Sequence, residues 1–261
     1  MTNWNWKAVR EFVERHVGIQ LRRSSCRTSL HRLRFVLKRP KKRLVKADEA
    51  KREAFVRQYV PLQREATAKI FFVDEAHFYA DVDLHAKWVP KREPALVDST
   101  SPRWGEKASY YSAVCPETGE VEDMPLDGNS SSETSVAFLT HLCAKHPEPL
   151  FIIWDNGPAH GGDPLRAYLH TLNLRMRLVR LPSYRPDDNA DEAMWRWIRE
   201  KVTANTCFGI KAKVREKVDH FFSGMATRAE EVKQRCRTAL LASAGALAES
   251  PLTCNVGPIA V

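Results

Sequence analysis

LFIIWD at residues 150–155 and KIFFVD at residues 69–74 are two apolar runs that each end in an aspartate. Short apolar runs with no polar alternation are typical of strands that are buried on both faces. A carboxylate at the end of such a strand is costly to bury unless a partner compensates its charge, and a divalent cation does this well. The sequence therefore predicts two core strands that carry Asp74 and Asp155 toward a shared cation.

The chain on either side of these two runs divides into further elements by its periodicity and its turn residues. We expect strands at 108–114, 121–126 and 177–181, and helices at 48–59, 130–146, 164–172 and 191–202. Two more helices are expected within residues 211–247. Three strands followed by alternating helices and strands predict an α/β domain with a mixed sheet.

Positive charge is concentrated at the N-terminus. The first 47 residues hold 14 of the 41 lysines and arginines but only 2 of the 32 acids, so they carry a net charge of +12 and the rest carries −3. A uniformly basic chain would indicate little, whereas one basic block predicts an element that binds a polyanion.

This basic block has the pattern of two helices. Apolar residues recur at helical spacing from Trp6 to Val17, Gly18 follows as a stop, and a second helix is expected from the caps Ser24 and Ser25 to Leu37. Such a pair resembles a helix-turn-helix, whose second helix enters the major groove. The alternative is a solvated basic helix with a flexible tail. The candidate DNA-binding residues are Arg22, Arg23, Arg27, Arg32, Arg34, Lys38, Arg39, Lys41, Lys42 and Arg43.

Cysteine usage and hydropathy bear on the compartment. The six cysteines form no C-x-x-C pair, which fits reduced thiols in a cytosolic protein better than a zinc ribbon or a disulfide framework. The apolar runs are too short to span a bilayer, and no signal-peptide pattern opens the sequence. We expect a cytoplasmic, nucleoid-associated protein without membrane contact.

Three blocks of sequence together resemble the signature of mariner-like bacterial insertion-sequence transposases, which belong to the DDE superfamily of endonucleases. The blocks are VDEAHF at 73–78, WDNGPAH at 154–160, and residues 181–195, which contain NADE at 189–192. Their order, with 81 positions from Asp74 to Asp155 and 37 from Asp155 to Glu192, is more specific than any one block. The resemblance covers roughly residues 1–205 and implies a ribonuclease H-like fold.

The resemblance also implies roles for the three acids. Asp74 becomes the bridging metal ligand, Asp155 the second ligand, and Glu192 the third ligand at the start of a helix. Phosphodiester cleavage of this type uses two hard cations, here Mg²⁺ or Mn²⁺. Because such acids crowd negative charge in a metal-free site, we expect Asp155→Asn to be at least as stable as the wild type without metal.

Several neighbouring residues carry alternative interpretations. Asp191 is a rival third ligand, Glu75 should face away from Asp74 by strand alternation, and His77 and His160 fit supporting roles better than ligation. Helical spacing places Trp195 beside Glu192, where its ring could stack on DNA. Solvated loop positions are expected for Asp81, Asp83, Asp187, Asp188 and Asp191.

The implied activity is that of a transposase that binds the terminal inverted repeats of its element, cleaves DNA and joins the 3′-hydroxyl to target DNA, with TA as target and a homodimer on DNA. We divide the chain into a helix-turn-helix segment with basic linker (1–47), a connecting helix (48–66), the catalytic domain (67–205) and C-terminal helices with a tail (206–261). Relatives carry an additional N-terminal helix-turn-helix, so a truncated, inactive DNA-binding remnant or repressor is the alternative. A general ribonuclease H-type nuclease is a third.

Overall fold

The computed structural model describes residues 5–36, 47–65, 67–100, 106–172, 175–183 and 185–248. The chain forms two compact units, Met1–Arg43 and Leu44–Val261. No helix in the described ranges is long and apolar enough to cross a membrane.

The N-terminal unit contains helices α1 (Trp6–Val17) and α2 (Arg23–Arg32). The side chain of Asn5 caps α1 by accepting hydrogen bonds from the backbone N–H groups of Lys7 and Ala8. Gly18 ends the helix in the left-handed region with φ 71°, as expected.

The expected second helix is wrong at both ends. It begins at Arg23, before the two serines, and it ends at Arg32 instead of continuing toward Leu37. The backbone N–H of Phe35 donates to Leu30 O and that of Arg34 to His31 O, which closes the helix in a Schellman motif with Arg34 at φ 62°. Backbone hydrogen bonding thus overrides the apolar spacing, which runs past this turn.

The second unit is built on a five-stranded sheet with the order β3-β2-β1-β4-β5. Its strands are β1 (Lys69–Tyr79), β2 (Lys107–Val114), β3 (Val121–Leu126), β4 (Leu150–Trp154) and β5 (Met176–Arg180). β2 is antiparallel to β1 and β3, whereas β4 is parallel to β1 and β5. The mixed α/β sheet expected from the sequence is confirmed.

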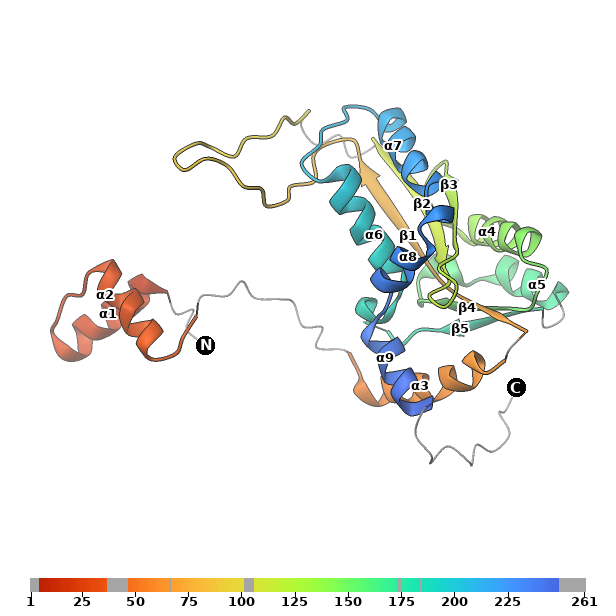
Figure 1. The fold of residues 1–261 in the computed structure, drawn as a ribbon, viewed down its shortest axis with the longest axis horizontal. Helices are drawn as coiled ribbons and strands as arrows, with labels where there is room; N and C mark the ends of the chain where they lie inside the picture. The colour runs from red at the N-terminus through yellow and green to blue at the C-terminus, as the bar shows by residue number, and fades with distance from the viewer. Residues whose placement is uncertain are drawn as a thin grey trace. The chain divides into compact units, whose positions relative to one another are not determined.

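Helices cover both faces of this sheet (Figure 1). One face packs against α4 (Ser132–Lys145) and α5 (Asp163–Thr171), and the other against α6 (Asp191–Ile198) and α7 (Lys211–Ser223). Strand alternation divides β1 between these layers: Phe71 and Val73 join the α4 side, and Ile70 and Phe72 join the α6 side. Asp74 therefore belongs to the face that α6 covers.

Within the second unit, the helices outside residues 67–205 share the core of the α6 side. α3 (Glu49–Gln63) lies beside α9 (Ala239–Ala248), and α8 (Ala229–Arg235) lies between α7 and α9 in the chain (Figure 1). Residues 211–248 thus hold three α-helices where two were expected, because a short 3₁₀ turn, Met225–Thr227, and a turn at 236–238 interrupt the apolar spacing. α6 is also shorter than expected and continues as a π-helical turn, Arg199–Thr203.

A buried ion pair holds α3 to the loop before α6. Arg52 Nε donates to both carboxylate oxygens of Asp188, at 3.2 and 2.9 Å, and their side chains are only 14 % and 5 % exposed. The expectation that Asp188 is a solvated loop acid is wrong, since Arg52 compensates its charge from a helix 136 positions away.

We expect Asp188→Ala to lower the free energy of unfolding by about 3 kcal/mol, because it removes the buried counter-charge of the Arg52 guanidinium and leaves only the exposed Glu49, at 3.5 Å. Urea unfolding of the full chain measures the loss. The neighbouring, exposed Asp187 provides a matched control, and Asp187→Ala should change stability by less than about 0.5 kcal/mol. A similarly small effect for Asp188→Ala would show that the ion pair does not hold α3.

Candidate active site

Asp74, Asp155 and Glu192 line one cavity of about 460 Å³. Asp74 comes from β1, Asp155 directly follows β4, and Glu192 lies in the first turn of α6. The parallel pairing of β1 with β4 aligns Asp74 with the end of β4, where Asp155 follows. The expectation that the first strand ends at Asp74 is wrong, since β1 continues to Tyr79 through its pairing with β2. The rest of the lining is Asn156, Gly157, Leu181, Pro182, Ser183, Arg185, Pro186 and Asn189.

The protein environment shifts the pKa values of the three acids in different directions. Burial, followed by the negative charges of Asp191 and Glu192, raises the pKa of Asp74 well above its ordinary value. Burial also raises the pKa of Glu192, although Arg199 and Arg196 oppose this. The pKa of Asp155 is lowered, first by its hydrogen bond with His160 and also by the backbone N–H of Gly157. Asp155 is thus stabilised as an anion without metal, whereas Asp74 is not.

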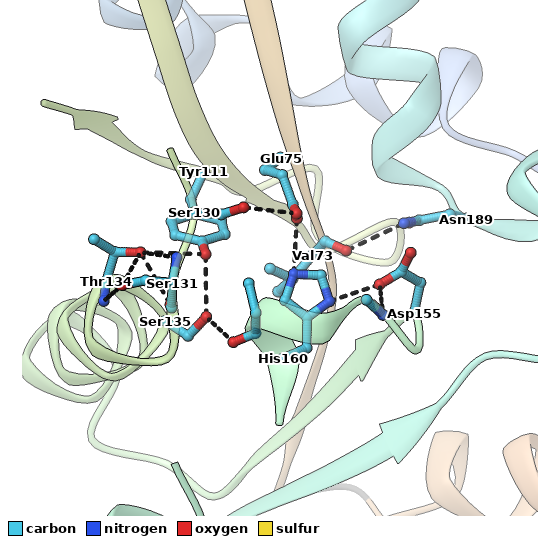
Figure 2. A network of polar contacts seen from close by, with 12 residues as sticks. Val73, Glu75, Tyr111, Ser130, Ser131, Thr134, Ser135, Asp155, His160 and Asn189 are labelled. Carbon is cyan, nitrogen blue, oxygen red and sulfur yellow. Dashed lines mark hydrogen bonds and ion pairs between the residues drawn. The ribbon is translucent and has the colours of Figure 1, made fainter. Parts of the chain in front are cut away.

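A hydrogen-bonded link sets the start of α6 against the sheet. Asn189 Nδ2 donates to Val73 O, the carbonyl next to Asp74 (Figure 2). Asn189 Oδ1 accepts from the backbone N–H of Asp191. The Ser112 hydroxyl lies 2.7 and 2.6 Å from the two carboxylate oxygens of Asp191. Because Ser112 pairs with Asp74 in the β1–β2 register, this link fixes Glu192 relative to Asp74.

Two expectations for this helix are therefore wrong. Asp191 is fully buried rather than solvated, and it does not line the cavity where a third ligand would lie. Trp195 is only 1 % exposed and packs edge-on against Phe78 and Phe222, so its ring cannot stack on DNA. Both side chains are held by residues from distant parts of the chain.

His160 connects the carboxylates of Asp155 and Glu75 (Figure 2). Its Nδ1 lies 2.6 Å from Asp155 Oδ1, and its Nε2 lies 2.8 Å from Glu75 Oε2. Burial lowers the pKa of His160, but the hydrogen bonds and negative charges of both acids outweigh this and raise it to about 9. Glu75 faces away from Asp74, as strand alternation predicts. His77, the histidine of β1, is hydrogen-bonded to Ser109.

Arg180 is a residue of the site that sequence reasoning missed. Its guanidinium donates to Asp155 O at 2.8 Å and also to His160 O, so it holds both ends of the loop that carries Asp155. Only the pairing of Arg180 with Trp154 in the β4–β5 register places it there, and no sequence motif marks it.

The donor set fits a hard divalent cation. Three carboxylates from separate elements are the ligands that Mg²⁺ and Mn²⁺ prefer, and a cation would offset the charge crowding that raises the pKa of Asp74 and Glu192. Among the residues that the structure describes, no three His, Cys, Asp or Glu side chains are arranged to hold a metal ion. Loading would therefore require these side chains to adjust.

The N-terminal unit exposes the other set of candidate residues. Arg22, Arg23, Arg27, Arg32 and Arg34 are all exposed on or next to α2. The guanidinium of Arg23 lies over the Trp6 ring of α1, 5.5 Å from its centroid. The predicted linker residues Lys38, Arg39, Lys41, Lys42 and Arg43 lie outside the described residues.

The chain belongs to the DDE superfamily endonuclease family, which matches residues 69–215. A winged helix-turn-helix family matches residues 2–59, in agreement with the predicted N-terminal segment. The chain is 24 % identical over 224 residues to the insertion element IS630 uncharacterized 39 kDa protein of Shigella sonnei. This alignment covers 84 % of the chain and 64 % of that relative, so the chain spans less than two thirds of its length.

Solved structures of the Mos1 transposase share the fold. The paired-end complex with the left transposon end has a TM-score of 0.62 at 16 % identity, covering 94 % of this chain and 80 % of that one. The Mos1 mariner paired-end complex with Mn has a TM-score of 0.61 at 16 % identity and the same coverage. The ribonuclease H-like fold expected from the sequence is confirmed.

Proposed function

We propose that this chain is a DDE transposase that binds the ends of its element and catalyses metal-dependent DNA cleavage and strand transfer. The observation that carries the proposal is the meeting of Asp74, Asp155 and Glu192 at one cavity of a DDE endonuclease domain. The likeness to IS630 and Mos1 proteins, one of them described in complex with a transposon end, supports the same function.

Asp74, Asp155 and Glu192 would hold Mg²⁺ or Mn²⁺, two ions in all, and the bound cations would activate the attacking oxygen and neutralise charge on the scissile phosphate. Asp74 and Glu192 favour a cation because their own environment opposes their charge. Asp155 supplies a carboxylate that is already ionised, held by His160 and Gly157. One of the similar Mos1 complexes was solved with Mn, which supports this choice of metal.

DNA recognition is assigned to the N-terminal unit. Residues 1–47 would bind the terminal inverted repeats, with the exposed arginines of α2 and the basic linker contacting phosphates and base edges. Residues 67–205 would perform catalysis, with residues 48–66 as connection and the helices of residues 206–261 supporting the sheet. We propose a homodimer on DNA, insertion at TA, and action at the nucleoid.

The test is an assay of cleavage and joining. DNA that carries the inverted repeats of the element is incubated with the full chain, a target plasmid and Mg²⁺ or Mn²⁺, and the junctions are sequenced. We expect cleavage at the repeat ends and joining at TA by the wild type, and neither by Asp155→Ala, which should still bind the repeats. Binding without cleavage by the wild type would indicate a remnant or repressor, and cleavage without preference for the repeats a general nuclease.

A further inference from the structure

Asp155 is held by one of its two carboxylate oxygens. Its Oδ1 lies 2.6 Å from His160 Nδ1 and accepts a hydrogen bond of 2.8 Å from the backbone N–H of Gly157. Oδ2 makes no hydrogen bond to any residue that the structure describes. The two contacts on Oδ1 fix the rotation of the carboxylate, and they leave Oδ2 for a ligand in the cavity that Asp155 lines.

His160 can hold this carboxylate because it is itself immobilised. Its side chain is 1 % exposed and stacks on the Trp154 ring with centroids 4.1 Å apart. Its backbone carbonyl accepts a hydrogen bond from Arg180, and Ser135 donates to the neighbouring Ala159 O at 2.8 Å. A Cβ at Gly157 would lie 3.0 Å from the imidazole, so the loop has little room to shift.

Glu75 fixes the far side of the imidazole. Its Oε2 lies 2.8 Å from His160 Nε2, and its Oε1 accepts a hydrogen bond of 3.2 Å from Ser130, which precedes α4. Figure 2 shows the resulting chain of contacts from Ser130 through Glu75 and His160 to Asp155. Both oxygens of Glu75 are thus occupied on the α4 side of β1, whereas Asp74 faces α6.

We infer that Glu75 and His160 are positioning residues, which hold Asp155 in the orientation that presents Oδ2 to a divalent cation. Neither residue lines the cavity, so each acts through Asp155 and not on the metal or the DNA. This inference rests on the proposed function in one respect only, the role of Asp155 as a metal ligand. Supporting contacts of this kind typically change metal affinity 10- to 100-fold.

The test measures Mn²⁺ affinity of the full, DNA-free chain by isothermal titration calorimetry. We expect His160→Leu and Glu75→Ala to raise the Kd for Mn²⁺ about tenfold or more. Glu75→Gln should stay close to the wild type, because its amide oxygen can accept from His160 and its amide nitrogen can donate to the Ser130 hydroxyl. His77→Leu is the matched control, since His77 lies on the same face of β1 but contacts Ser109, and it should leave the Kd unchanged.

Circular dichroism of the metal-free variants selects those that are folded. If His160→Leu does not fold, the comparison of Glu75→Ala with Glu75→Gln tests the inference on its own. Wild-type affinity in folded Glu75→Ala would overturn the inference. Equal weakening in Glu75→Gln and Glu75→Ala would also overturn it, because the charge of Glu75 and not its hydrogen bonding would then matter.

Cleavage of repeat-bearing DNA is followed in parallel over a range of Mn²⁺ concentrations. In Glu75→Ala, half-maximal cleavage should need more Mn²⁺, and the rate at saturating Mn²⁺ should largely recover. If the wild type cleaves while the variants bind Mn²⁺ normally, the inference fails and the proposed function stands. If Mn²⁺ binding depends on Glu75 and His160 but the wild type does not cleave, the proposed function fails alone.

Discussion

Asp74→Asn is expected to raise the melting temperature of the metal-free protein by several degrees. Folding raises the pKa of Asp74 well above the value of 3.8 that applies to the unfolded chain, so the folded state binds this proton more tightly. The wild type therefore loses stability as the pH rises from about 4 through the folded-state pKa. Asparagine keeps the shape and removes that loss. Thermal melts between pH 5.5 and 8 should show a difference in melting temperature that grows with pH.

The same variant should cleave repeat-bearing DNA at least about a thousandfold more slowly, since removing a metal ligand forfeits several kcal/mol of transition-state stabilisation. A gain in stability together with a loss of activity is typical of a functional residue rather than a structural one. Asp163→Asn serves as control, because that side chain is 94 % exposed on α5. An Asp74→Asn protein that is less stable without metal and still active would contradict the assignment.

Removal of residues 1–47 is expected to weaken DNA binding by about a hundredfold or more at moderate salt, and to leave the second unit folded. The deleted segment carries the whole positive excess of the chain, and each phosphate that it neutralises releases counterions. α3 begins at Glu49, so the deletion keeps its packing against α9.

Fluorescence anisotropy with labelled repeat DNA measures both proteins over a salt titration. For the intact chain, the logarithm of the affinity should fall steeply with the logarithm of the salt concentration, and the truncated chain should show a much smaller slope. Equal affinities and slopes would show that the basic segment does not bind DNA.

The strands around the site were predictable because a continuous run of apolar residues indicates a buried strand. The apolar runs before Asp74 and Asp155 became β1 and β4, and the parallel pairing of these strands placed both acids at one cavity. The spacing to Glu192 located the third acid only through family resemblance. No local signal in the sequence would bring it to the same cavity.

The burial of single polar side chains could not be predicted, because it depends on partners far away in the chain. Asp191 is buried against Ser112, 79 positions distant, and Asp188 against Arg52, 136 positions distant. The local sequence around each acid predicts a loop or the start of a helix. Tertiary contacts, and not local propensity, decided that both are buried.

Nothing in the sequence indicates that the charges of Asp74 and Asp155 affect the stability of the metal-free protein differently. The expectation that Asp155→Asn would be at least as stable as the wild type without metal is revised by the structure. The pKa of Asp155 is lowered by its contacts with His160 and Gly157, so its charge stabilises the folded state above about pH 4, and that stability is lost as the pH falls. We now expect Asp155→Asn to be less stable than the wild type without metal, in contrast to Asp74→Asn.

The most direct test of the account is the response of thermal stability to metal in single variants of the three acids. A cation that binds only the folded state raises the melting temperature by mass action. With millimolar Mn²⁺ or Mg²⁺, the wild type and the control Asp163→Asn should melt at a higher temperature than without metal. Asp74→Asn, Asp155→Asn and Glu192→Gln should each lose most of that increase, whatever their stability without metal. An undiminished increase in all three variants would contradict the claim that these carboxylates hold the catalytic metal.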